Sequence, residues 1–451
     1  MDPSQDSEDV TIGGPAYAGN IRSARLRIAM VVYGDISHDS RVQREAISLV
    51  EAGHSVTLFC LPGSQLPGGH DPTTWRDPRV TVVTRKPVAT QVVPRSPSPF
   101  RSSTPRSRLW HIFDRAAWVW NYARNVRSWG AAVVEEGGLF DIWHAHDFTG
   151  LVAISGRGAS RRRIVYDVHD IFLEGGTALQ LPRPVREALR RYERRLTRHT
   201  EAVVTVNDAL AEVLQKSYRP RSIVVVHNCP ARWVIPEPRP DLIRASAGIP
   251  ADAPVVLYHG VLGPTRGLEM LCDALLEPSM RDVHVALMGY GVLLESLVAM
   301  AREQRFGGRL HVLDSVPPSE LLPWVASADV GAVSMPAATL NLYLSTPNKL
   351  FECLAAGTPV VVSDFPAVRR IVIDDKFGPL GTVCRSPEPR EMAEAIGSII
   401  RLQTADGADL RARCAASART RWNWETEVAG LLALYEGLAA AGRSTSAGAD
   451  R

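Results

Sequence analysis

A lysine and a glutamate stand three residues apart at the start of a predicted helix that leads into a buried strand. Lys349 and Glu352 share one face of this helix, because residues three apart are neighbours on a helix surface. Thr346 can serve as the N-cap with Pro347 as the first helical residue, and Gly357 ends the helix. A helix N-terminus attracts phosphate through its free N–H groups and partial positive charge. The stretch therefore favours a nucleotide site, with a capped helix and a surface ion pair as the plain alternative.

A second positive charge precedes another predicted helix. The sequence there indicates a strand that ends at Gly260, a loop, and then Arg266 just before the helix. Arg266 would place a permanent charge where a second phosphate could bind. A single arginine is more often an ordinary surface residue, but Lys349 on the neighbouring strand–helix unit favours the phosphate interpretation.

Two glycine-rich nucleotide motifs are absent from the sequence. Gly289 and Gly291 follow a predicted strand and would let the backbone approach a ligand, but no third glycine completes a G-x-G-x-x-G pattern. No Walker A sequence is present either. These absences argue against a dinucleotide-dependent oxidoreductase and against a P-loop enzyme.

Two clusters of histidine and aspartate follow predicted strands in the N-terminal half. The first is the run 141–147, Asp-Ile-Trp-His-Ala-His-Asp, and the second is 166–170, Tyr-Asp-Val-His-Asp. Polar residues at strand ends face the cleft of a parallel sheet, so two such clusters on one rim raise the odds of a functional role. A metal site from His144, His146 and Asp167 is conceivable, but their spacing matches no dedicated cage, and we expect no metal.

Charge and cysteine content exclude several protein classes. The chain has 451 residues, enough for two domains, and its 51 basic and 48 acidic residues leave a net charge of only +3, which argues against a general nucleic-acid binder. Its six cysteines are scattered without C-x-x-C spacing, so neither a zinc site nor a disulfide framework is indicated. No apolar signal segment and no uninterrupted apolar run of about 18 residues is present. We expect a cytoplasmic protein.

Strand–loop–helix–strand patterns recur along the chain and predict an α/β fold with two doubly wound, Rossmann-like halves facing a cleft. Residues 1–24 and 442–451 are expected to be loose tails, and 62–108 a long loop region with one short strand. The N-terminal, acceptor-binding domain is predicted at 25–235, the C-terminal, donor-binding domain at 236–421, and a final helix at 422–441 that completes the first domain. The proline-rich segment 234–253 is interpreted as the linker between the domains.

Two basic segments in the N-terminal half hint at an anionic or lipid-linked acceptor. The predicted helix 183–199 carries seven arginines, and the segment 110–129 carries four tryptophans among basic residues. A solvated arginine face and ordinary core packing are the commoner explanations. Peripheral contact with the inner membrane face therefore stays open, as does the oligomeric state.

The motifs taken together resemble one known family. The chain is similar to the retaining nucleotide-sugar glycosyltransferases of family 4, which have the GT-B architecture, and the resemblance runs from about Arg27 to Leu438. Singly each motif is weak, but their order along the chain is specific. The motifs are residues 39–46 with 53–54, 144–147, 166–169, 226–228, 258–260, 266–269 and 347–352, and the helix that begins with Trp-Asn-Trp at 422–424 is similar to the helix that crosses back to the N-terminal domain.

The resemblance implies roles for individual residues. Arg266 and Lys349 would bind the donor diphosphate, Glu352 the ribose, and His169 would lie beside the transferred sugar. The donor-binding residues implied are Gly260, Arg266, Gly289, Ser315, Val316, Asn348, Lys349, Leu350 and Glu352, with the base held by backbone near Ser315 and Val316. The acceptor-side residues implied are Gly34, Asp39, Arg41, His146, Asp147 and Asp167. The catalytic residues implied are His169, Arg266, Lys349 and Glu352.

The sequence departs from the family pattern at one position. Many members carry Glu-x7-Glu with Glu352 as the second glutamate, but the first position is Leu344 here. A carboxylate nucleophile at that point is unsupported, and the backbone near 341–345 would have to supply those sugar contacts. The resemblance implies metal-independent front-face transfer from a UDP- or GDP-linked sugar with retention of configuration, in natural-product or cell-envelope biosynthesis. A sugar-nucleotide epimerase and a degenerate nucleotide-sugar binding protein are the alternatives.

Overall fold

The computed structural model describes most of the chain outside its two ends and one long stretch near residue 90. The predicted tail 1–24, most of the predicted loop 62–108, and the side chains of Trp110 and Trp118 lie outside the described part, as do residues 448–451. The described residues are 25–37, 39–62, 77–86, 108–136, 138–156, 158 and 162–447.

The N-terminal half is built on a seven-stranded parallel sheet with the strand order β3-β2-β1-β4-β5-β6-β7. The chain reverses its direction of winding between β1 and β4, the place where open α/β sheets bind ligands. The central strands β4 and β5 are buried along their whole length, because helices cover both faces of the sheet. The strands are β1 Arg27–Val32, β2 Ser55–Cys60, β3 Thr81–Thr84, β4 Ile142–His146, β5 Ile164–Val168, β6 Ala202–Thr205 and β7 Ile223–Val225.

The C-terminal half repeats this plan with a six-stranded parallel sheet in the order β10-β9-β8-β11-β12-β13, which confirms the two doubly wound halves. The sequence analysis missed β13, although Gly-Pro at 378–379 and Ser-Pro at 386–387 bracket this strand as turn signals. The strands are β8 Val255–Val261, β9 His284–Tyr290, β10 Leu310–Leu313, β11 Val330–Val333, β12 Val360–Ser363 and β13 Gly381–Cys384.

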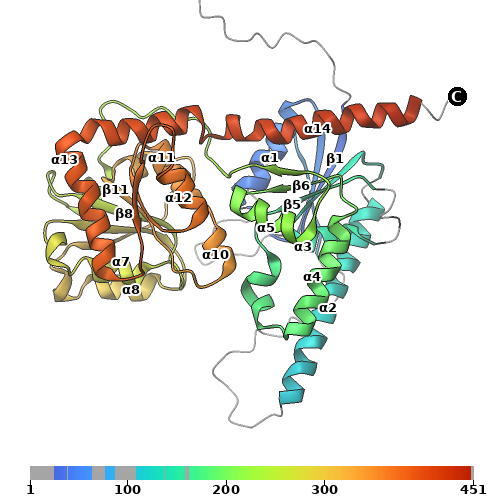
Figure 1. Cartoon of the computed structure of the whole chain (residues 1–451), viewed down its shortest axis with the longest axis horizontal. Coiled ribbons are helices and arrows are strands. Elements are labelled where there is room, and N and C mark those ends of the chain that lie inside the picture. The colour runs from blue at the N-terminus through green and yellow to red at the C-terminus, as the bar shows by residue number, and fades with distance from the viewer. Residues whose placement is uncertain are drawn as a thin grey trace, which may run out of the picture.

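Helices cover both sheets, and α2 and α4 extend well below the first sheet in Figure 1. The helices of the N-terminal half are α1 Ser40–Glu51, α2 Arg108–Glu136, α3 Asp147–Ile154, α4 Arg183–Thr197 and α5 Asp208–Tyr218, with short 3-10 turns η2 Phe172–Glu174 and η3 Gly176–Gln180. Those that follow are α6 Leu242–Ala247, α7 Leu268–Ala274, α8 Leu294–Ala301, α9 Leu321–Ala326, α10 Leu340–Leu344, α11 Asn348–Ala355, α12 Pro366–Val372, α13 Pro389–Thr420 and α14 Trp424–Ala447. None of the described helices is long and apolar enough to cross a membrane.

Three of these helices differ from the sequence-based expectation. The predicted linker 234–253 contains α6, and α14 continues to Ala447, past the expected end at 441. In α11 the N-cap is Pro347, and Thr346 lies one residue earlier, where its hydroxyl accepts a hydrogen bond from Asn207. The predicted end of α11 is confirmed, because Gly357 adopts a left-handed φ of 63° just after the helix.

The last helix, α14, joins the two halves of the molecule. Figure 1 shows it following α13 and running along the edge of the N-terminal half, where it packs against α1 and β7. The indole N–H of Trp424 donates to the Ser48 hydroxyl at 2.9 Å, and Tyr435 is buried in the core of the N-terminal half. The C-terminal helix therefore completes the fold of the N-terminal half.

Candidate active site

A lysine side chain lies beside the backbone of a glycine at the end of β8 in the C-terminal half. Lys349, in the first turn of α11, holds its Nζ atom 3.5 Å from the ring centre of Tyr258, a close cation–π contact. Gly260 has a φ of 111°, and a Cβ atom placed on it would lie 3.9 Å from the Lys349 Nζ atom. The ammonium group thus stands directly beside exposed backbone, where an anionic ligand can touch both.

The two predicted phosphate-binding cations have no carboxylate partner among the described residues. Among the described residues, the one polar contact of Arg266 is a 3.7 Å approach to the Met335 sulfur, and Lys349 has the aromatic contact described above. Burial lowers the pKa of Lys349 to about 7, and the nearby charge of Arg266 adds to this shift. Two positive charges that repel each other and lack a counter-ion form a strong site for an anion.

Glu352, one turn further along α11, is held as a carboxylate. Its Oε2 atom lies 2.8 Å from Nε2 of His259, the residue before Gly260. Burial alone would raise the pKa of Glu352, but the hydrogen bond from His259 and the charges of His259, Arg44 and Lys349 lower it. The carboxylate is therefore ionised and can accept hydrogen bonds from hydroxyl groups.

His169 is the partly exposed centre of the corresponding cluster in the N-terminal half. Its Nε2 atom lies 2.9 Å from Oδ2 of Asp167, and its Nδ1 atom lies 3.7 Å from Oδ2 of Asp147. Burial alone would lower the pKa of His169, but the charges of Asp147 and Asp167 raise it to about 10. At neutral pH His169 is an imidazolium, which can stabilise negative charge and cannot accept a proton.

Strained backbone marks both clusters. Asp147 and Thr265 have left-handed φ values of 57° and 65°, and only one other described non-glycine residue has a positive φ. Asp147 accepts a hydrogen bond from the backbone N–H of His169, and Thr265 directly precedes Arg266. Such conformations cost of order 1–3 kcal/mol and cluster at functional sites.

His169 rests on a network of fully buried polar side chains. The register of β4 and β5 sets His146 opposite Asp167, and Arg41 of α1 holds both Asp167 oxygens at 2.9 Å. Arg41, His146 and Asp167 are all buried, so they support the site from within the sheet. The other residues expected on the acceptor side, Gly34, Asp39 and Asp147, are partly exposed. The sequence placed the two histidines of this cluster after the strand, whereas β4 continues through His146.

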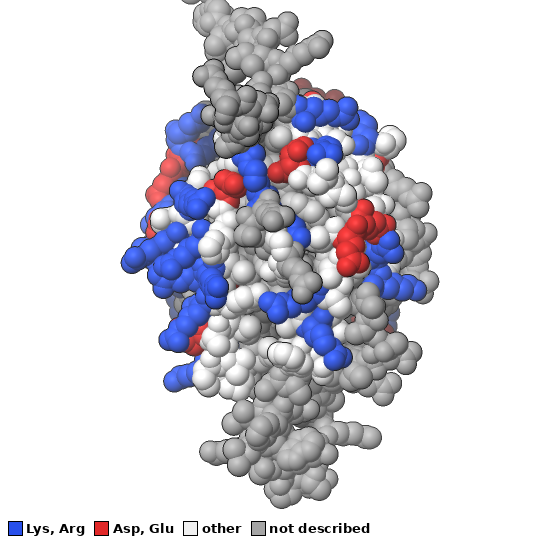
Figure 2. Space-filling view, turned by 90° about the vertical axis from the view of Figure 1, so that its right-hand side faces the viewer, with Lys and Arg blue, Asp and Glu red and all other residues white. Residues whose placement is uncertain are grey.

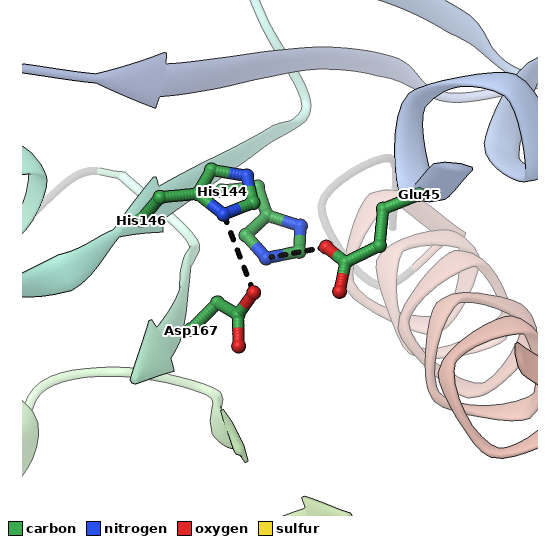
Figure 3. A group of neighbouring side chains, drawn as sticks. All are labelled: Glu45, His144, His146 and Asp167. Atoms are coloured by element: carbon green, nitrogen blue, oxygen red, sulfur yellow. Dashed lines mark ion pairs between the residues drawn. The ribbon is translucent and has the colours of Figure 1, made fainter. Parts of the chain in front are cut away.

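Four side chains of this network lie close enough to hold a metal ion. Figure 3 shows Glu45 from α1, His144 and His146 from β4 and Asp167 from β5 converging, and their ligand atoms lie within 4.8 Å of one another. Arg41 already fills this space, since it contacts both Asp167 oxygens and lies 3.1 Å from Glu45. Burial and the charge of Asp167 raise the pKa of Glu45 to about 8. The Arg41 guanidinium is already fixed in this space and the Glu45 carboxyl group is protonated. The four side chains are therefore poor ligands for a metal ion.

The side-chain amides of Asn341 and Asn207 form hydrogen bonds between the two halves. The Asn341 amide group of α10 bonds both backbone groups of Ile171, at 2.9 and 3.0 Å, two residues after His169. Leu344 is 7% exposed and packs in the core of the N-terminal half, while its carbonyl accepts from Asn207. The position expected for a glutamate is therefore an apolar anchor. Asn341 was named only as backbone in the sequence analysis, because its partner lies 170 residues away.

Charges on the two halves also act on each other. Burial and the charge of Asp147 raise the pKa of Asp170 to about 6, and the charge of Arg266 from the other half opposes this rise. Arg44 of α1 contributes to the low pKa of Glu352 in α11. The two clusters therefore face each other across one site.

The remaining predicted residues lie around this site in different ways. Asn348 is exposed at the start of α11 and accepts a hydrogen bond from Asn228 of the other half. Leu350 is a core residue, so only its backbone is available to a ligand. Gly289 pairs with Gly260 in the sheet, where a Cβ atom would lie 1.9 Å from the Gly260 carbonyl oxygen. Packing alone thus requires that glycine.

Four predicted residues lie on loops at the carboxyl ends of strands. Ser315 is exposed and Val316 partly buried in the loop after β10. Gly34 follows β1, and Asp39 caps α1 by accepting from the Val42 N–H at 3.1 Å. Of these residues, Asp39 acts on the N-terminal cluster, because its charge helps to raise the pKa of His169.

The fold and this site define a class of protein. Sucrose-phosphate synthase from Thermosynechococcus elongatus superposes with a TM-score of 0.67 at 18% identity, over 92% of this chain and 100% of the other. Anabaena Alr3699/HepE in complex with UDP gives a TM-score of 0.62 at 17% identity, again over 92% and 100%. The fold is the GT-B fold, two Rossmann-like domains facing each other.

Sequence comparisons place the chain more narrowly. A family model described as Glycosyltransferase Family 4 matches residues 40–229, and one described as Glycosyl transferases group 1 matches residues 253–401. The D-inositol 3-phosphate glycosyltransferase of Xylanimonas cellulosilytica is 29% identical over 200 residues, 43% of this chain and 44% of that protein. The Mycobacterium tuberculosis (strain F11) protein of the same name is 26% identical over 320 residues, 68% and 63%. The chain, which matches less than two thirds of either relative, belongs to the family 4 glycosyltransferases.

Proposed function

We propose that this protein transfers a sugar from a nucleoside-diphosphate sugar to an acceptor, with retention of anomeric configuration. The observation that carries the proposal is the pair of cations around Gly260. Arg266 and Lys349 have no carboxylate partner in the described part of the chain, and Glu352 stands one turn away as a carboxylate for ribose hydroxyls. A diphosphate joined to a ribose matches this order of charges.

The chemistry we propose is a front-face substitution. The acceptor oxygen, nitrogen or sulfur attacks the anomeric carbon on the side from which the diphosphate leaves, and the departing phosphate oxygen takes the acceptor proton. Arg266, Lys349 and the N-terminus of α11 stabilise the charge that grows on the leaving group. His169 is already protonated, so its part is electrostatic, beside the transferred sugar.

A uridine nucleotide is the first donor to test, with a guanosine nucleotide second. The structurally similar Alr3699/HepE was solved with UDP-glucose, and both leading sequence relatives are named D-inositol 3-phosphate glycosyltransferases. We propose that no metal is required, because two cations stand where a magnesium ion would act. A cytoplasmic location with peripheral contact at the inner membrane face fits an acceptor held in a lipid.

A degenerate nucleotide-sugar binding protein is the second candidate, favoured by the buried Leu344 at the position of a family glutamate. Nucleotide release separates the candidates. The purified protein is incubated with UDP-glucose or GDP-mannose, with and without EDTA, while UDP and GDP release is followed alongside a thermal-shift titration. Binding with EDTA-insensitive release supports the transferase. Binding without release, across a panel of acceptors, supports the degenerate protein, and absence of binding contradicts both.

A further inference from the structure

An apolar cavity of about 380 Å³ lies between α2, α3 and α4 of the N-terminal half. Aliphatic and aromatic side chains make up almost all of its wall, among them Val126, Phe148, Val152, Phe172 and Leu189. This volume is within the usual range for small-molecule sites. The mechanism described above does not use this cavity.

Two residues of the cavity wall lie close in sequence to residues of the catalytic cluster. Phe148 directly follows Asp147, and Phe172 comes three residues after His169. The two phenylalanine rings pack 5.4 Å apart, so the segments that carry Asp147 and His169 form the inner wall. The segments that carry Asp147 and His169 thus also carry part of the cavity wall.

Positive charge borders the cavity on its outer side. Arg127 lines it and donates to the Tyr192 hydroxyl at 2.8 Å, which joins α2 to α4. Arg183 and Arg195 on α4 and Arg198 at its C-cap are exposed, with no ion pair among the described residues. Figure 2, which views this end of the molecule, shows basic side chains outnumbering acidic ones around an uncharged area. An apolar hollow with a basic border complements a hydrocarbon chain that carries an anionic group.

We propose that the acceptor is an amphiphile whose hydrocarbon chain occupies this cavity and whose anionic head group lies against Arg127. The inference rests on the proposed function, because it names the class of molecule that receives the sugar. It assigns Val126, Val152 and Leu189 as residues that select for a chain. Such an acceptor would be held in an anionic lipid surface. The basic face of α4 would then contact that surface.

Decyl phosphate, below its critical micelle concentration, is a suitable probe because it carries a chain and a charge but no sugar. Ala123→Trp fills the cavity from α2, and Leu189→Gln places a polar group in its wall. Ala131→Trp, on the exposed face of the same helix, is the matched control. We expect wild type and A131W to bind decyl phosphate alike, and both cavity variants to bind it at least about tenfold more weakly. Decyl maltoside should bind more weakly than decyl phosphate. Inorganic phosphate, which the Lys349 and Arg266 site can also bind, should show the same affinity in wild type and in both cavity variants.

UDP thermal shifts in the same variants separate the two proposals. Unchanged UDP binding beside weakened decyl phosphate binding supports the chain site. Equal decyl phosphate affinity in wild type and in both folded cavity variants overturns it. Binding that begins only after removal of residues 87–107 also overturns it, since the cavity would then hold part of this chain. Absence of UDP binding contradicts the proposed function and leaves the decyl phosphate result to stand on its own.

Discussion

The Nε2 atom of His169 lies 2.9 Å from Oδ2 of Asp167, and this contact decides which chemistry His169 can perform. Asp167 is fully buried and keeps its negative charge because Arg41 and His169 lower its pKa against the opposing effect of burial. The pair holds the imidazole charged and fixed in orientation. A histidine in this state suits charge stabilisation at neutral pH better than general-base catalysis.

The charge of His169, more than its shape, should govern its effect on turnover. We expect His169→Asn to lower kcat by about 10²-fold, and His169→Lys to retain more activity than His169→Asn because it restores the positive charge. Initial rates with a fixed donor and acceptor test this order. UDP thermal shifts should match wild type in both variants, since the donor phosphates are assigned to the other half. Equal losses in the two variants would contradict an electrostatic role.

The two unpaired cations should be needed for turnover and dispensable for folding. Lys349→Ala and Arg266→Ala should each lower kcat by about 10²–10³-fold, as expected for losing one preformed contact to the developing charge. Neither removes an ion pair between described residues, so thermal unfolding without ligand should stay close to wild type. Lys376→Ala, an exposed lysine on the same half, is the control. Near-wild-type rates in both site variants would rule out the phosphate assignment.

Local signals were enough to predict the two sheets, the helix α11 and the loop that carries Arg266. Each depends on residues adjacent in sequence: a helix start expected at Pro347, one residue before the observed one, a glycine at a strand end, and an arginine before a helix. The resemblance added the order of the motifs. The sixth strand β13 was missed although turn signals bracket it, because its four residues show no alternation by themselves.

Contacts between distant segments could not be predicted from one sequence. His146 and Asp167 were expected on an open rim, but α1 covers them and supplies Arg41, which lies 126 residues from its partner Asp167. Leu344 was recognised as a departure from a motif, and only its packing in the other half gives it a structural role. The apolar cavity likewise depends on how α2, α3 and α4 meet.

The lowered pKa of Lys349 predicts that nucleotide binding takes up a proton. Its pKa is about 7 in the free protein, and a bound phosphate should raise that pKa by favouring the charged ammonium. Lys349 is therefore increasingly neutral above pH 7 in the free protein, and binding must restore the proton. We expect UDP affinity to fall roughly tenfold from pH 7 to pH 9, where the nucleotide phosphate, with a pKa near 6, is already ionised.

Calorimetry in two buffers of different ionisation enthalpy measures this proton uptake directly. The Lys349→Arg variant serves as the control, because a guanidinium stays charged throughout the range and should give a flatter profile. A wild-type affinity that stays constant from pH 7 to pH 9 would show that the lysine is fully charged before the nucleotide arrives.

The two hydrogen bonds between the Asn341 side chain and the Ile171 backbone should affect how readily the two halves separate. One side chain satisfies both backbone groups of Ile171, so Asn341→Ala leaves a donor and an acceptor without these partners, at a cost of about 1–3 kcal/mol to the closed arrangement. The active site combines Lys349 from one half with His169 from the other, so a looser closure should lower kcat several-fold. UDP affinity should change little, because the groups assigned to UDP lie on one half. Single-turnover rates and UDP titrations of N341A, with N125A on α2 as the control, separate these quantities. A variant with weakened UDP binding and an unchanged rate would instead place Asn341 in the donor site.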